Sequence, residues 1–252
     1  MNPLNLDWCP IPSIQETPLS LQESIMERPS PVVDREVLLE VENEDDQPGR
    51  DVIIIFAVFF EGGLAPLSLF LGWWLGHNPL AQFAWSATDA LWGVLAAVPL
   101  VLLFLLLTLR WPIGPLRQIK MFCEEEFIPL LAGSSWSDMA LIALSAGVGE
   151  EMLFRGVIQT SMGAWLGIGW GLLFASLLFG LLHPISMPYI VVAAVVGLYL
   201  GGAFLLTGNL LTVMVTHSLY DFALMSYLLR YHYRGGPINP IHPLDPDANI
   251  DD

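Results

Sequence analysis

Long apolar stretches follow one another from Val52 to Arg230, and this feature limits the possible folds more than any other. Each stretch is about 20 residues long, the length that a helix needs to cross the ~30 Å hydrocarbon core of a bilayer. We predict spans at residues 52–76, 85–109, 137–160, 165–184, 187–207 and 209–230. The predicted fold class is therefore all-α, a polytopic transmembrane helical bundle of about six spans.

Composition supports a membrane protein independently of any motif. Hydrophobic residues make up 54% of the chain and charged residues 13%, against about 25% charged residues in a typical soluble domain. A mean hydropathy of +0.60 over 252 residues exceeds what a small water-soluble globule can bury, because such a globule has too much surface. We therefore expect a multi-pass integral membrane protein whose main partner is the lipid bilayer.

The charges lie mostly at the two ends of the chain. Residues 1–51 contain twelve of the 25 acidic residues, and four more follow Arg234. The net charge of −16 argues against a nucleic-acid partner, which requires a basic surface. Cys9 and Cys123 lie in different segments without metal-ligand spacing, so neither a disulfide framework nor a zinc ribbon is predicted.

Four regions are predicted along the chain. Residues 1–50 are rich in Pro, Glu and Ser and are expected to form a disordered acidic arm. Residues 51–136 contain two spans and a loop whose MFCEEEFIPLL portion is expected to lie along the membrane interface. Residues 137–232 contain the other four spans, and residues 233–252 form an acidic tail.

Basic residues predict the orientation in the membrane. With six spans, all of the basic positions near span ends fall on one side, namely Arg50, the loop from Arg110 to Lys120, Arg230 and Arg234. Lys and Arg are enriched in cytoplasmic loops. Both termini are therefore predicted to be cytoplasmic. The first fifty residues lack a basic region followed by an apolar run, so no cleavable signal peptide is expected.

Ionisable residues inside the spans indicate where function resides, because they are costly in a membrane and usually face a cavity or a partner. Glu61 lies in the first span and Asp89 near the start of the second. A larger set lies in the later spans and consists of Glu150, Glu151, Arg155, His183, His217 and Asp221.

The first group of this set lies in the sequence GVGEEMLFRG. Glu151 and Arg155 are four residues apart, so on a helix they share a face and can pair. Glu150 lies about 100° around the helix, where the same arginine cannot easily serve it. An unpaired buried carboxylate suits a general acid or base. The alternative is an ion pair that only specifies helix packing.

His217 and Asp221 repeat the four-residue spacing. The carboxylate can orient the imidazole, both groups can ligate a metal, or the pair can simply join two helices. His183 precedes Pro184 and, taken alone, is most simply a satisfied histidine at a helix end. Together, two histidines and several carboxylates in consecutive spans can activate a water, with or without a metal.

Three motifs in order resemble the CPBP intramembrane proteases, a family that includes the type II CAAX prenyl endopeptidases and bacteriocin-processing and self-immunity proteins. They are Glu-Glu-x-x-x-Arg at 150–155, Phe-x-x-x-His at 179–183 and His-x-x-x-Asp at 217–221. The resemblance covers about residues 137–230. It implies that residues 137–232 are a catalytic core of CPBP type.

The resemblance also implies a role for each residue. Glu150 would activate the hydrolytic water, His183 would help to hold it, and Glu151 with Arg155 would support the site. His217 and Asp221 would bind the oxyanion or a metal. Zn²⁺ is the candidate cofactor, held by Glu150, His183 and His217, and a metal-free glutamate mechanism is the alternative.

Asp221 departs from the commonest family pattern, in which this position is Asn. An amide can donate a hydrogen bond to an oxyanion, whereas an ionised carboxylate only accepts. Asp221 is therefore protonated, a metal ligand, or a partner that keeps His217 charged, and we favour the last. His183 lies nearer the end of its span than Glu150 and His217 do. Either its helix shifts or the site opens into a water-filled vestibule, on the cytoplasmic side.

These features predict an intramembrane endopeptidase that cuts a membrane-associated protein or peptide. The alternative is a catalytically silent family member that acts as a membrane scaffold or regulator. A proton-coupled carrier is a third class, which the absence of a recognisable internal repeat makes the least favoured.

Overall fold

The computed structural model describes residues 48–106 and 114–233. The chain divides into a unit of residues 1–47 and a unit of residues 48–252, and all of the described residues belong to the second. The predicted acidic arm and acidic tail thus lie outside the described residues, except for their innermost positions. Within the described ranges every regular element is helical, which confirms the all-α fold class.

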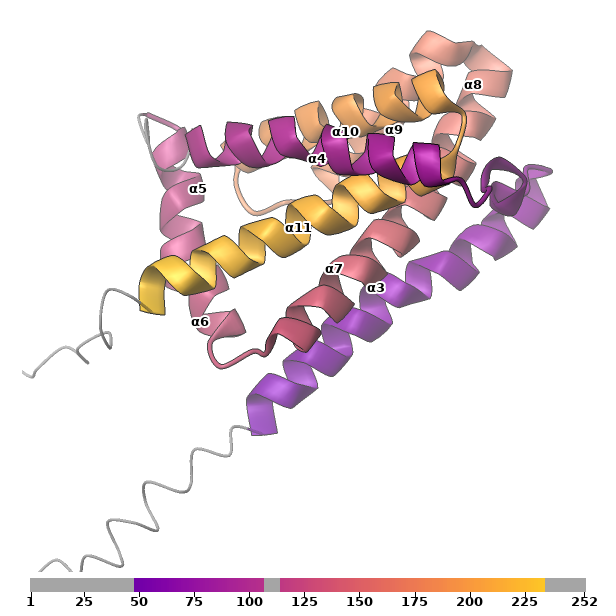
Figure 1. Cartoon of the computed structure of the whole chain (residues 1–252). Helices are drawn as coiled ribbons and strands as arrows, with labels where there is room; N and C mark the ends of the chain where they lie inside the picture. The colour runs from indigo at the N-terminus through magenta and orange to yellow at the C-terminus, as the bar shows by residue number, and fades with distance from the viewer. Residues whose placement is uncertain (1–47, 107–113, 234–252) are drawn as a thin grey trace, which may run out of the picture. The chain divides into compact units, whose positions relative to one another are not determined.

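Helices account for all six predicted spans, and a bent helical segment lies between the second and the third (Figure 1). The elements in chain order are α3 (Pro48–Leu75), η1 (Pro79–Gln82), α4 (Ala87–Leu105), α5 (Leu116–Phe122), η3 (Cys123–Phe127), α6 (Ile128–Leu131), α7 (Trp136–Glu151), η4 (Met152–Gln159), α8 (Thr160–Leu166), α9 (Ile168–Leu181), α10 (Met187–Thr207) and α11 (Leu210–Tyr233).

Helix ends follow local sequence signals. The side chains of Ser86, Ser135 and Ser186 accept hydrogen bonds from backbone N–H groups in the first turns of α4, α7 and α10, which satisfies donors that a helix start leaves free. Ser135 and Asp138 form a reciprocal capping box. Gly208 ends α10 in the left-handed conformation, with φ of 67°, which a residue without Cβ adopts at no steric cost.

Fewer helices qualify as spans by length and hydropathy than the six predicted. Among the described residues three qualify alone, namely α3 from Asp51, α4 and α10. A fourth qualifies if Leu116–Leu131 and Trp136–Leu166, which meet at a bend of 116°, are counted together. With 14 residues, α9 is only about 21 Å long. Polar side chains such as His217 and Asp221 lower the hydropathy of α11.

The surface of the bundle is more apolar than its centre. Phe59, Trp73 and Leu206 are 76%, 77% and 90% exposed, whereas Glu151 and Arg155 are 0% and 1% exposed. A water-soluble protein has the opposite distribution. Lipid is the solvent in which such a surface is stable, so the chain is an integral membrane protein.

Helix contacts place the polar centre between the later helices. α11 packs against both α4 and α7, α3 runs along α7, and α10 packs against α9 and α11 (Figure 1). Apolar side chains of α4, η4, α10 and α11 fill the core beside the polar groups, including Leu100, Met152, Leu200 and Val213. The helices therefore hold the polar groups of α7, η4 and α11 in a fixed arrangement.

Candidate active site

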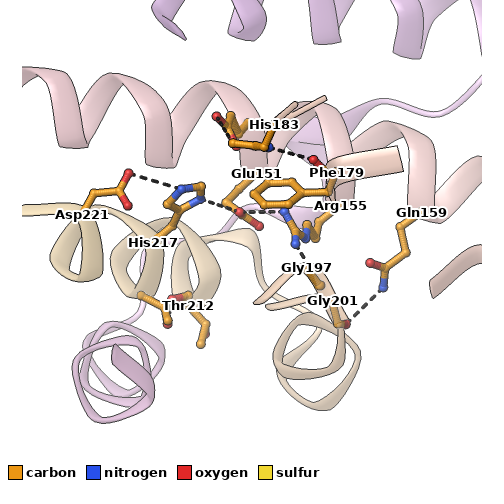
Figure 2. Close-up of polar contacts among 12 residues, drawn as sticks. Glu151, Arg155, Gln159, Phe179, His183, Gly197, Gly201, Thr212, His217 and Asp221 are labelled. Carbon is orange, nitrogen blue, oxygen red and sulfur yellow. Dashed lines mark hydrogen bonds and ion pairs between the residues drawn. The ribbon is translucent and has the colours of Figure 1, made fainter. Parts of the chain in front are cut away.

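All six predicted site residues lie in one polar cluster. Glu150 and Glu151 end α7 and Arg155 lies in the π-helical segment η4. His183 follows the end of α9, and His217 and Asp221 lie four residues apart in α11. Figure 2 shows a row of contacts that runs from Asp221 through His217, Glu151 and Arg155 to Gly197.

The predicted ion pair of Glu151 and Arg155 is present and buried. Arg155 Nη1 donates to Glu151 Oε1 at 2.8 Å, and Nη2 donates to the Gly197 carbonyl of α10 at 2.9 Å. The guanidinium carbon lies 4.8 Å from the centroid of the Phe179 ring, within cation–π range. One arginine therefore contacts its own helix, α10 and α9.

Gln159 extends this contact by one turn, and it was not predicted. Its Nε2 donates to the Gly201 carbonyl at 3.1 Å. Arg155 and Gln159 are four residues apart, and so are their acceptors Gly197 and Gly201 (Figure 2). The two donors thus join η4 to α10 at successive turns. Nothing in the spacing of the sequence motifs indicates Gln159.

His217 lies between two carboxyl groups. Its Nδ1 is 2.7 Å from Glu151 Oε1 and its Nε2 is 3.4 Å from Asp221 Oδ2. Two carboxylates at the two ring nitrogens favour an imidazolium with both N–H groups. This geometry is the one required if Asp221 keeps His217 charged. At 3.4 Å the contact with Asp221 is the longer, so Nε2–H is the more loosely held donor.

Glu150 has a different environment from Glu151. It is 7% exposed, its nearest basic atom is His183 Nε2 at 3.9 Å, and among the described residues Oε2 accepts no hydrogen bond. Arg155 donates hydrogen bonds to Glu151 and Gly197 and none to Glu150 within the described ranges, in line with the 100° offset on the helix. Glu150 is thus the carboxyl group that is not used to hold the structure.

His183 is oriented by the helix that precedes it. Its Nδ1 lies 2.7 Å from the Phe179 carbonyl, and since a carbonyl only accepts, Nδ1 carries the hydrogen. In the neutral imidazole Nε2 is then an acceptor that faces Glu150. α9 ends at Leu181, and the chain turns back at once. After this early end, His183 lies beside Glu150, with Nε2 3.9 Å from Glu150 Oε1.

A further ionisable residue, Glu61 of α3, also lies at this cluster. Its backbone carbonyl lies against Gly149, the residue before Glu150, and its Oε2 is shielded from solvent. The sequence showed an acid inside the first span, but 89 residues separate it from Glu150 and no motif links the two. Only the packing of α3 against α7 brings them together.

The predicted zinc ligands do not form a matching set of donors. Both nitrogens of His217 face carboxyl oxygens, and in the described ranges no group of three His, Cys, Asp or Glu side chains is placed to hold a metal ion. Of the three predicted ligands, only Glu150 and His183 have a ligating atom that no carboxyl group of another residue contacts closely. The residues present do not fit the predicted metal, and no step below involves one.

Comparisons with known proteins concern the second half of the chain. The family model described as "Type II CAAX prenyl endopeptidase Rce1-like" matches residues 132–223, a range that contains all six cluster residues predicted from the motifs. No curated protein and no solved structure matches the chain. Residues 132–223 of this integral membrane protein are therefore similar to the Rce1-like type II CAAX prenyl endopeptidases, in agreement with the family that the three motifs resemble.

Proposed function

We propose that this protein is an intramembrane endopeptidase in which Glu150 activates a water for peptide hydrolysis. The observation that supports the proposal most directly is the pair of Glu150 and His183. Glu150 is buried, its Oε2 has no partner among the described residues, and it faces an imidazole nitrogen 3.9 Å away. That gap is too long for a direct hydrogen bond and suits one bridging water.

Two acceptors on opposite sides orient such a water. It donates one hydrogen to Glu150 and the other to Nε2 of neutral His183, which leaves an oxygen lone pair directed at the substrate. Glu150 takes a proton as the water oxygen bonds to the carbonyl carbon, and the carbonyl π electrons move to its oxygen. When the C–N bond breaks, Glu150 gives that proton to the leaving amine, so the carboxylate is regenerated.

His217 supplies the charge that an oxyanion needs. Its Nε2–H is held only loosely by Asp221, at 3.4 Å, so it can turn to the negative oxygen as this oxygen forms. Glu151 holds Nδ1 at 2.7 Å and is itself fixed by Arg155. These groups therefore keep the imidazolium in place without taking part in bond breaking. In this mechanism Asp221 stabilises the charged form of His217 and does not contact the substrate.

The proposed substrate is a membrane-associated protein or peptide, cut near the cytoplasmic face. The side chain of His183 is 27% exposed, against 9% for that of Glu150. The site thus opens on the side of His183, at the end of α9. A bond within a lipid-exposed helix is shielded by its own backbone hydrogen bonds, so the segment that is cut must be extended where it enters the site.

Glu150→Gln is the first test. The amide keeps the size of the side chain but cannot take a proton, so we expect cleavage to fall at least about 100-fold while the protein still inserts and folds. Glu125→Gln makes the same change at an exposed position of η3 and should leave the rate unchanged. Proteomics of membranes with wild type or Glu150→Gln should reveal one accumulated precursor, which purified wild type then cleaves.

Two results would contradict the proposal. One is a Glu150→Gln variant that cleaves at the wild-type rate. The other is a biological effect of the protein that persists unchanged in Glu150→Gln membranes with no precursor accumulated. The second result would support the scaffold or regulator, because such a protein needs the fold and not the base.

A further inference from the structure

The end of the π-helical segment η4 is fixed by side-chain hydrogen bonds to two neighbouring elements. Gln159, the last residue of η4, is buried and donates from Nε2 to the Gly201 carbonyl of α10 at 3.1 Å. Thr160, which follows, donates from Oγ1 to the Arg155 carbonyl at 2.9 Å and accepts from Nε2 of Gln82 at 3.1 Å. These contacts hold the end of η4 against both α10 and η1.

Glycine at position 201 makes room for the glutamine. A Cβ built there would lie 2.5 Å from Gln159 Oε1 and 2.5 Å from Cδ1 of Leu172. A side chain at position 201 would thus displace the amide from the carbonyl that it contacts. Oε1 itself accepts no hydrogen bond among the described residues. The local structure therefore uses this glutamine for its N–H group.

Two hydrogen bonds at successive turns fix the register of η4 on α10. Arg155 Nη2 donates to the Gly197 carbonyl at 2.9 Å, one turn before the contact made by Gln159 (Figure 2). One hydrogen bond lets a helix pivot and slide against its neighbour, whereas a second bond one turn along opposes both movements. Gln159 thus holds η4 in a register that Arg155 alone would leave adjustable.

The register of η4 reaches the site through short contacts. Arg155 Nη1 donates to Glu151 Oε1 at 2.8 Å, and the same oxygen lies 2.7 Å from His217 Nδ1. All three side chains are buried, so bulk solvent cannot replace a lost partner. A shift of η4 along α10 would move the guanidinium, then the carboxylate and finally the imidazole. Contiguous hydrogen-bond networks carry coupling of this kind.

We infer that Gln159 is a positioning residue of the active site: its hydrogen bond to α10 holds η4 in register and thereby sets where the His217 ring lies. Gln159 acts through Arg155 and Glu151 and does not touch the substrate. The effect on catalysis rests on the proposed function. The effect on the position of His217 does not, and it can be measured without a substrate.

Nuclear magnetic resonance of the full-length, histidine-labelled protein in lipid bilayers tests the position of His217. A ring N–H that donates to a carboxylate over 2.7 Å forms a short, strong hydrogen bond, and its proton signal lies at low field. The absence of this signal in His217→Gln assigns it. Gln159→Met keeps the length of the side chain but lacks the donor, so we expect the signal to move to higher field as the contact with Glu151 lengthens.

Tyr199→Phe is the matched control for stability. Tyr199 also lies in α10, and its hydroxyl donates to the Ala96 carbonyl of α4 at 2.9 Å, so this substitution removes a hydrogen bond between helices without changing η4. Both Tyr199→Phe and Gln159→Met should lower the thermal midpoint by about 2–4 °C, the effect of one neutral hydrogen bond. Only Gln159→Met should shift the His217 signal.

Kinetics with the precursor from Glu150→Gln membranes test the effect on catalysis. Gln159→Met should lower kcat about 10-fold, because small displacements of catalytic groups are costly, with KM within about twofold. Gly201→Ala keeps the glutamine but displaces its amide, so it should reproduce the lower kcat and the shifted signal even if Gln159→Met fails to insert. Gly202→Ala, whose Cβ would meet nothing within 4 Å, should reproduce neither.

Three results would overturn the inference. An unshifted His217 signal in Gln159→Met would mean that η4 keeps its register without this donor. Wild-type kcat in Gln159→Met, measured beside an inactive Glu150→Gln, would remove Gln159 from the site and leave the proposed function intact. An equal loss of kcat in Tyr199→Phe would make stability, and not position, the cause. A fully active Glu150→Gln with a shifted signal in Gln159→Met would instead overturn the proposed function alone.

Discussion

Arg155 is almost fully buried and its charge is nevertheless well compensated. Glu151 neutralises it, the Gly197 carbonyl accepts from it, and the Phe179 ring covers it. Removal of one member of a buried ion pair leaves the other charged in a low-dielectric interior, which costs more than the pair itself contributes. Glu151 would also lose the group that fixes its contact with His217. The residue thus supports both stability and site geometry.

Arg155→Met should therefore lower the free energy of unfolding by about 3–5 kcal/mol, measured by denaturant titration of the protein in detergent micelles. Lys120→Met is the matched control, since Lys120 forms an exposed pair with Glu124 at 3.6 Å, and exposed pairs contribute about 1 kcal/mol or less. Similar losses in the two variants would mean that the buried pair has no special role.

At the scale of the element, two helices depart from regular geometry at the site. The segment η4 is π-helical from Met152 to Gln159, and such wide turns occur frequently at functional sites. Helix α9 ends after 14 residues. Through the first departure, the side chains of Arg155 and Gln159 reach backbone carbonyls of α10. Through the second, His183 comes to lie beside Glu150. Site geometry therefore depends on where helices widen or end.

The close contact between α3 and α7 depends on the glycine at position 149. In Gly149→Ala the new Cβ would overlap the Glu61 carbonyl, so α3 must move away. We expect a loss of about 1–3 kcal/mol in stability and a fall in cleavage of about 10- to 100-fold, because small shifts of catalytic groups are costly. Gly63→Ala in α3 meets nothing within 4 Å and should change neither quantity. Unchanged cleavage by Gly149→Ala would contradict the close contact.

The molecule as a whole has its polar groups inside and its apolar groups outside. Trp73 and Leu206 face outward while Glu151, Arg155 and His217 are buried. The lipid-facing side chains stabilise the bundle in the bilayer, and the cluster is exposed mainly at His183 and Asp221, whose side chains are 27% and 26% exposed. This separation is what allows ionisable groups to persist inside a membrane, since each is paired or faces a polar cavity.

An even number of spans places both termini on one side, and the basic residues predict that this side is cytoplasmic. A protease-cleavable tag fused to either end should therefore be accessible from the cytoplasmic side of intact membrane vesicles and protected from the other. Tags accessible from opposite sides would show an odd number of spans.

Much of the protein was predictable from the sequence because the relevant physics is local. Apolar stretches of about 20 residues predicted helices at six places, and each is present. Four-residue spacing predicted that Glu151 meets Arg155 and that His217 meets Asp221, and both contacts are present. The 100° angle between Glu150 and Glu151 around the helix predicted that Arg155 would pair with Glu151 and not with Glu150. Periodicity along one helix suffices for all of these statements, since no other helix takes part.

Contacts between helices were decided only by the tertiary structure. The approach of Glu61 to Glu150 depends on the packing of α3 against Gly149, and the acceptors of Arg155 and Gln159 are backbone carbonyls of α10. Neither leaves a signal at fixed spacing, because the partners lie 89 and 42 residues apart. His217 joins Glu151 across two helices, which occupies the nitrogens that spacing alone left open to a metal. The sequence determined which charged groups enter the membrane, and packing determined which of them meet.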